Sequence, residues 1–205
     1  AEKIFRESKK GVPHEPENKL DWVSINPEYL ISIYDRMVTE SGAKILFFSR
    51  LAAVEMSSDD TIDAIIVSNK AGLVAFKGKV YIDATGDGDL AAWSGASFKR
   101  GYDEKGSVQM SSLCFSFANI DSYDYMNGPT LYVWKDESTP LYKAVRSGKY
   151  PLVDTHFCNN LVGPDVIQCN AGHMTVDTTD PWAISEAMIL GRQKAVQYLL
   201  SLIHI

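Results

Sequence analysis

The sequence is poor in several features that mark particular classes of protein. It has only 3 cysteines in 205 residues and no C-x-x-C pair, which argues against a zinc site and against a disulfide framework. It has no cluster of basic residues and a net charge of -6, so a nucleic-acid partner is not expected. Its most apolar stretch, residues 187–205, is interrupted by Arg192 and Lys194. No stretch therefore reaches the ~20 apolar residues of a membrane span.

What the sequence does contain is typical of a globular protein. Apolar residues make up 45% of the chain, and a chain of this length can bury a core without metal or disulfide staples. We expect free, buried thiols at Cys114, Cys158 and Cys169, with a single disulfide as the alternative. The start, Ala1-Glu2-Lys3, has no signal-peptide pattern, which favours a cytoplasmic protein. A periplasmic or secreted location is the alternative if a signal peptide has been removed.

Local signals predict two long helices. Asn26 and Pro27 form a cap and a first turn, and Gly42 ends the segment. Residues 179–181 start a second helix with a cap followed by proline. Its apolar stripe consists of Ile184, Met188, Gly191, Ala195, Leu199 and Leu202.

Short apolar runs between turn residues predict a series of strands. The first 25 residues are polar and are expected to be irregular. We predict strands at 45–48, 51–56, 62–68, 73–76, 80–82, 111–118 and 166–169, short helices at 90–93 and 140–147, and loops at 121–130 and 159–164. Residues 51–76 are predicted to form an antiparallel meander.

The most informative stretch is residues 79–95, KVYIDATGDGDLAAWSG. A predicted strand runs into a loop of glycines and aspartates, and a helix follows. Small residues let the backbone approach a ligand closely, and amides at the helix start can face a phosphate. Such sites lie beyond the carboxyl ends of strands in open α/β sheets. The alternative is a tight turn with an aspartate cap. The spacing of Asp83, Asp87 and Asp89 departs from a calcium loop, so no metal is expected.

This stretch resembles the FAD-dependent oxidoreductase family. The residues that carry the resemblance are Ile82 to Ala92 with Gly95-Ala96 after them, supported by the helix-to-strand segment 26–46 and the D-x-T-D-P helix start at 177–192. The resemblance implies the second half of a two-dinucleotide-binding-domain flavoprotein fold. It also implies FAD contacts at Leu51, Ala84, Thr85, Gly86, Asp87 and Gly88, with Gly86 allowing close approach and Asp87 binding a hydroxyl of the flavin chain or orienting the loop.

The family opens with a strand, a G-x-G-x-x-G turn and a helix, and residues 1–25 contain only one glycine, Gly11. We therefore expect an internal piece of a larger flavoprotein, inactive alone. An apolar face left uncovered could drive self-association.

The fold class predicted from these observations is α/β. We expect a partial Rossmann-like FAD-binding domain with an antiparallel meander, plus part of a mixed-sheet substrate domain. The expected segments are an irregular 1–25, an FAD-binding half at 26–100, a substrate-side segment at 101–165, and a return strand and long helix at 166–205.

The function that the resemblance implies is hydride transfer between flavin and a small organic substrate, with catalytic residues unassigned. An alternative is a non-catalytic carbohydrate- or protein-binding module, suggested by Tyr123, Tyr125, Tyr132, Trp134 and Tyr142. Core packing is the plainer interpretation of these aromatic residues.

Packing or loop roles are the simpler interpretation of the remaining polar residues. A hydrolase or lyase using His156 or His173 is a weaker alternative, since neither an orienting partner nor an oxyanion site is visible beside Cys158 or Cys169. Arg192 is expected in a buried or interdomain ion pair.

Overall fold

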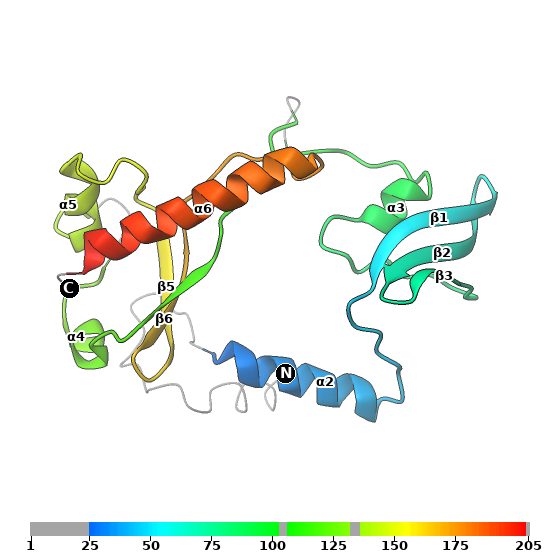
Figure 1. The fold of residues 1–205 in the computed structure, drawn as a ribbon, viewed down its shortest axis with the longest axis horizontal. Helices are drawn as coiled ribbons and strands as arrows, with labels where there is room; N and C mark the ends of the chain where they lie inside the picture. Colours follow the sequence, from blue (N-terminus) through cyan, green and yellow to red (C-terminus); the bar gives the residue numbers. More distant parts are fainter. Residues whose placement is uncertain (1–24, 103–105, 132–135, 204–205) are drawn as a thin grey trace. The chain divides into compact units, whose positions relative to one another are not determined.

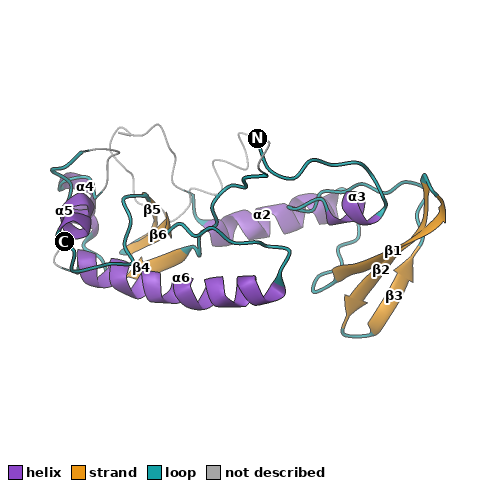
Figure 2. Ribbon diagram, turned by 90° about the horizontal axis from the view of Figure 1, so that it is seen from above, coloured by secondary structure: helices purple, strands orange, loops and turns teal. Residues whose placement is uncertain are grey.

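The computed structural model describes residues 25–102, 106–131 and 136–203. The chain divides into two compact units, residues 38–107 and residues 1–37 with 108–205. Each unit is described by itself. The described residues form an α/β chain with two three-stranded antiparallel sheets (Figures 1 and 2).

The unit of residues 38–107 is built around the predicted meander. Strands β1 (Arg50–Ser58), β2 (Thr61–Asn69) and β3 (Gly72–Phe76) pair in the order β1-β2-β3. The Asn69 side chain accepts a hydrogen bond from the Ala71 amide at 2.9 Å, and Gly72 has φ +101°, a combination that suits a tight hairpin. The short helix α3 (Asp89–Trp93) follows and contacts β1.

Two strands predicted in this unit do not form. Residues 45–48 and 80–82 have no strand pairing in the described part of the chain. Val80 and Ile82 are 78% and 84% exposed, whereas the hydroxyl of Tyr81 between them donates to the Asp63 carbonyl at 2.9 Å. Side chains thus alternate in direction over residues 80–82 as in a strand. No strand forms there, because a strand needs a neighbour for its backbone hydrogen bonds.

The other unit holds a second sheet and most of the buried core. Strands β4 (Phe115–Ala118), β6 (Val166–Ala171) and β5 (Phe157–Gly163) pair in that order. Helix α6 (Pro181–Leu202) lies across one face of this sheet in both views (Figures 1 and 2). Helices α4 (Ser122–Asn127) and α5 (Pro140–Arg146) also contribute to the core. The core consists of Leu131, Leu141, Val153, Phe157, Leu161, Ile167, Cys169, Ala171 and Tyr198.

Several expectations for this unit are corrected. The loop predicted at 121–130 contains α4, which Asp121 caps by accepting from the amides of Tyr123 and Asp124. Residues 159–163 of the loop predicted at 159–164 belong to strand β5, because pairing with β6 outweighs the weak strand propensity of the asparagines. The mixed sheet expected here is antiparallel among the described strands, and the strand predicted at 111–118 is confined to Phe115–Ala118.

The two long helices begin where the sequence predicts. Helix α2 (Pro27–Glu40) is capped by the Asn26 side chain, which accepts from the Glu28 amide at 3.0 Å. Helix α6 is capped by Asp180, which accepts from the Trp182 amide at 2.8 Å. No helix among the described residues is long and apolar enough to cross a membrane.

The predicted apolar stripe of α6 is only partly buried. Ile184 and Met188 are each 39% exposed, and the fully buried side chain is Tyr198, outside that stripe. Gly191 is buried, and Leu113 packs so closely on it that an added Cβ would lie 2.7 Å from the Leu113 Cβ. The three thiols are free, as predicted, but only Cys169 is buried, since Cys158 is half-buried and Cys114 is exposed.

Candidate functional site

The loop between Ile82 and helix α3 is organised around the carboxylate of Asp83. One carboxylate oxygen, Oδ1, accepts from the amide and the hydroxyl of Thr85 at 2.9 and 2.7 Å. The other, Oδ2, accepts from the Ala91 amide at 2.9 Å. These donors stabilise the ionised form, the Ala91 amide most of all, so the pKa of Asp83 is lowered from its ordinary value. Asp83 therefore connects the segment that ends at Ile82 to helix α3.

The hydroxyl of Thr85 extends this network to the start of the helix. Its oxygen accepts from the amides of Gly88 and Asp89 at 3.0 and 3.2 Å. Gly88 occupies the cap position of α3 with φ +72°, which a residue with a Cβ adopts only at a cost. The sequence DATGDGD thus folds into a turn that is held by hydrogen bonds among its own residues.

This network corrects one expectation. Amides at the start of the following helix were expected to face a ligand, but those of Asp89 and Ala91 already donate to Thr85 and Asp83. The part of the loop that stays open is Gly86 and Asp87. Both residues are exposed, neither is engaged by another described residue, and nothing lies within 4 Å of a Cβ added at Gly86. Two amides and one carboxylate therefore remain available.

The remaining predicted cofactor contacts lie in the same unit. Ala84 is exposed in the loop, and Leu51 is half-buried on β1, opposite Val67 of β2. A ladder irregularity follows Leu51 in the pairing of β1 with β2. Because β1 contacts α3, one compact unit contains every residue that the resemblance implies for FAD.

A metal site is not assembled in the described part of the chain. No group of three histidine, cysteine or acidic side chains there could hold a metal ion. Asp83 is the first residue of the calcium-like spacing. Its carboxylate already accepts from the amides of Thr85 and Ala91 and from the Thr85 hydroxyl.

The structure brings together the two histidines noted in the sequence. The rings of His156 and His173 stack with centroids 3.9 Å apart, and His156 Nε2 lies 3.5 Å from the Cys158 sulfur. Burial lowers the pKa of His156, the charge of His173 lowers it further, and Asp154 opposes both effects. Burial also raises the pKa of the Cys158 thiol, which disfavours the thiolate that a nucleophile needs.

Sequence reasoning missed the residue that fixes this pair, Asp154. Its carboxylate accepts from the amides of His156 and His173, each at 2.9 Å, and from the hydroxyl of Tyr198 at 2.9 Å. Burial is the main cause that raises the pKa of Tyr198. Asp154 lies between two loops and α6, so no local spacing could have identified it.

The aromatic stretch serves several separate purposes. The Tyr125 hydroxyl donates to Asn159 Oδ1 at 2.7 Å, and the Tyr142 hydroxyl donates to Glu137 Oε1 at 3.2 Å. Tyr123 is 72% exposed. Tyr132 and Trp134 lie outside the described residues. Arg192, expected in an ion pair, is exposed on α6.

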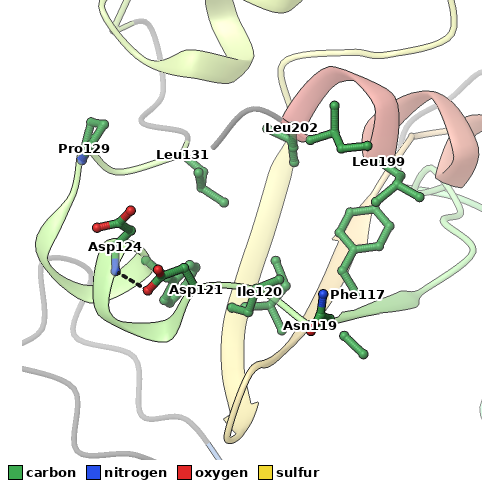
Figure 3. Close-up of a pocket in the computed structure, with 13 residues that line it drawn as sticks. Phe117, Asn119, Ile120, Asp121, Asp124, Pro129, Leu131, Leu199 and Leu202 are labelled. Atoms are coloured by element: carbon green, nitrogen blue, oxygen red, sulfur yellow. Dashed lines mark hydrogen bonds between the residues drawn. The ribbon is translucent and has the colours of Figure 1, made fainter.

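One cavity near α4 is apolar (Figure 3). Its volume is about 220 Å³, and its walls include Phe117, Ile120, Leu131, Ile167, Leu199 and Leu202. Asp121 also lines it, but Oδ1 of that residue accepts from the Asp124 amide at 3.0 Å to cap α4. This cavity has the size and character for a small apolar group.

Comparison with known proteins gives one match. A family model described as FAD dependent oxidoreductase matches residues 1–205. No curated protein and no solved structure matches the chain.

Proposed function

Because the chain belongs to the FAD-dependent oxidoreductase family, we propose that residues 84–88 contact FAD in an enzyme that transfers a hydride between flavin and a small organic substrate. FAD is the cofactor of this family. When bound, the flavin supplies the hydride chemistry, and the protein supplies binding, orientation and electrostatics.

The observation that carries this proposal is that some residues of the loop bond to one another while others stay exposed. The hydrogen bonds of Asp83 and Thr85 lie within the turn, and no described residue is bonded to the amides of Gly86 and Asp87. The missing Cβ at Gly86 leaves the backbone open to close approach. Backbone amides suit the pyrophosphate oxygens of FAD, and the Asp87 carboxylate suits a hydroxyl donor. The residues present therefore fit the group.

In the same proposal Leu51 lies beside the adenine and contacts it mainly through its backbone. The support is that β1 and α3 contact each other within one compact unit. We assign residues 26–100 to the FAD-binding half, 101–165 to the substrate side, and 166–205 to the return segment.

The chain supplies only part of the site in this proposal. Its support is the exposure of apolar side chains on the two segments with strand-like sequence, such as Phe47 at 61%, Val80 at 78% and Ile82 at 84%. Apolar surface of this kind is ordinarily covered by a neighbouring element. A further strand of a longer flavoprotein would cover it, and self-association is the alternative cover.

A spectroscopic experiment tests the proposal. The visible absorption spectrum of the longer protein in which we place this chain should show flavin bands. A fluorescence titration then compares the affinity of variants of that protein for FAD. Asp87→Asn should weaken binding about tenfold or more, because one hydrogen bond to a charged group is worth ~1.5–3 kcal/mol.

The matched control is Asp59→Asn, the same change at an exposed turn of the same unit. It should leave the affinity for FAD unchanged. Absence of flavin bands from the longer protein would overturn the redox function. Equal affinity of the Asp87→Asn and Asp59→Asn proteins would overturn the assignment of the loop.

A further inference from the structure

A second cavity, distinct from the glycine-rich loop, lies in the unit that contains α6. Its volume is about 550 Å³. Its walls come from residues 151–152, from the segment 173–177 after β6, and from one side of α6 between Ala183 and Lys194. All the residues discussed below belong to one compact unit.

The ammonium group of Lys194 is held in place at this cavity. Its Nζ donates to the Leu152 carbonyl at 3.1 Å. Its aliphatic stem lies against Gly172, where an added Cβ would be 3.1 Å from the lysine Cδ. The side chain is half-buried. An ammonium has three donors, and the carbonyl uses one.

Lys194 has no counter-ion among the described residues. The carboxylate of Asp154 is occupied by two amides and the Tyr198 hydroxyl. Oδ1 of Asp177, which lines the cavity, accepts from the amide and the hydroxyl of Thr179 at 3.0 and 2.6 Å. The described ion pairs involve other cations, Lys77 and Arg146. A partly desolvated cation that is bonded only to a carbonyl favours an anionic ligand.

His173 supplies a second donor on the same cavity. Its backbone amide is bonded to Asp154, and its ring is stacked against His156. His173 lines the cavity and His156 does not. A neutral imidazole still carries one N–H. The two contacts orient the ring at the cavity, and no described carboxylate is bonded to either ring nitrogen.

We propose that this cavity binds a small monocarboxylate with an apolar body, whose carboxylate is held by Lys194 and His173. Met174, Ala187 and Leu190 provide the apolar wall. Two carboxylates also line the cavity, those of Asp177 and Glu186. Glu186 precedes Lys194 by eight residues and is therefore about 12 Å away along the helix at ~1.5 Å per residue. It disfavours a second carboxylate at that end.

This inference does not depend on flavin binding, so the test uses the full chain without FAD. Isothermal titration with hexanoate is compared with hexylamine and hexan-1-ol, which keep the apolar body and change the charge. Hexanoate should bind at least tenfold more tightly than either. Adipate, with carboxylates at both ends, should bind more weakly than hexanoate.

Variants assign the binding to this cavity. Lys194→Gln should weaken hexanoate binding about tenfold or more, while Lys194→Arg retains the charge and most of the affinity. Arg192→Gln removes a cation from an exposed position on the same helix and should change nothing. Circular dichroism verifies the folding of each variant. Gly172→Ala is a second variant that should weaken hexanoate binding, because its Cβ displaces the aliphatic stem of Lys194.

Three outcomes would overturn the proposal. They are equal affinity for hexanoate and hexylamine, wild-type affinity in a folded Lys194→Gln protein, and the absence of hexanoate binding by the folded wild-type chain. None of these results changes the outcome of the FAD titration, so the two proposals fail separately.

Discussion

The two three-stranded sheets of this protein differ in what covers them. The sheet β4-β6-β5 has α6 across one face and places Phe157, Leu161 and Ile167 in a continuous buried core. The meander β1-β2-β3 is joined by shorter local turns, yet Leu73 is 72% exposed. Hairpin signals alone are therefore enough to specify pairing, whereas burial depends on an element that packs against the sheet. The sheet β4-β6-β5 contributes most of the buried core, whereas the meander lies in the unit that contains the glycine-rich loop.

The largest test of this difference is the same substitution in each sheet. Leu161→Ala removes a fully buried side chain of β5 and should cost about 2–5 kcal/mol of unfolding free energy. Leu73→Ala removes an exposed one from β3 and should stay within about 0.5 kcal/mol. Urea denaturation followed by circular dichroism measures both. Equal costs would show that the meander is covered as well as the other sheet.

A smaller difference is expected for two tyrosine hydroxyls. The Tyr198 hydroxyl donates to the Asp154 carboxylate at 2.9 Å within the core, so Tyr198→Phe should cost about 1.5–3 kcal/mol. The Tyr81 hydroxyl donates to the Asp63 carbonyl, a neutral acceptor, and Tyr81→Phe should cost about 0.5–1.5 kcal/mol. The same denaturation experiment ranks them. A reversed order would contradict the central position of Asp154.

The smallest expected effect is an acid response of two turns, one in each unit. The pKa of Asp83 is lowered mainly by the Ala91 amide, and that of Asp136 mainly by the Ser138 hydroxyl, from an ordinary value of 3.8. A lowered pKa means that the stabilisation is present above the ordinary value and is lost as pH falls through the folded value. Acidification below pH 3.8 should therefore weaken both turns.

Amide chemical shifts in a pH titration measure this response. The Ala91 amide reports on Asp83, and the Ser138 amide reports on Asp136. Asp83→Asn should abolish the acid shift of the Ala91 amide and leave that of Ser138, and Asp136→Asn should do the reverse. Loss of both shifts in either single variant would contradict independent turns.

Features set by neighbouring residues were predictable from the sequence. The caps at Asn26 and Asp180 and the turn before Gly72 act within a few residues, and the elements they define formed as expected. The cap at Asp121 is equally local and was missed, because its helix has only six residues and no apolar periodicity. Residues 45–48 and 80–82 were misassigned for the opposite reason, since a strand needs a partner that their own sequence does not contain.

The candidate site was predictable in part. The pattern of glycines and aspartates identified the loop. It did not show that Asp83 is the aspartate that accepts from the Ala91 amide, because that bond depends on how helix α3 folds against the loop. Lys194 and His173 could not be connected from sequence. They are 21 residues apart and line one cavity because α6 lies along the segment that follows β6.

The internal bonding of the Asp83–Thr85 turn has a consequence for the timing of ligand capture. Its donors and acceptors are already matched before anything binds. In the proposed FAD site, a cofactor that approaches Gly86 and Asp87 would meet a turn that is already ordered, so binding would lose little affinity to the ordering of the loop. The rate of encounter would then be limited by diffusion and orientation rather than by refolding of the turn.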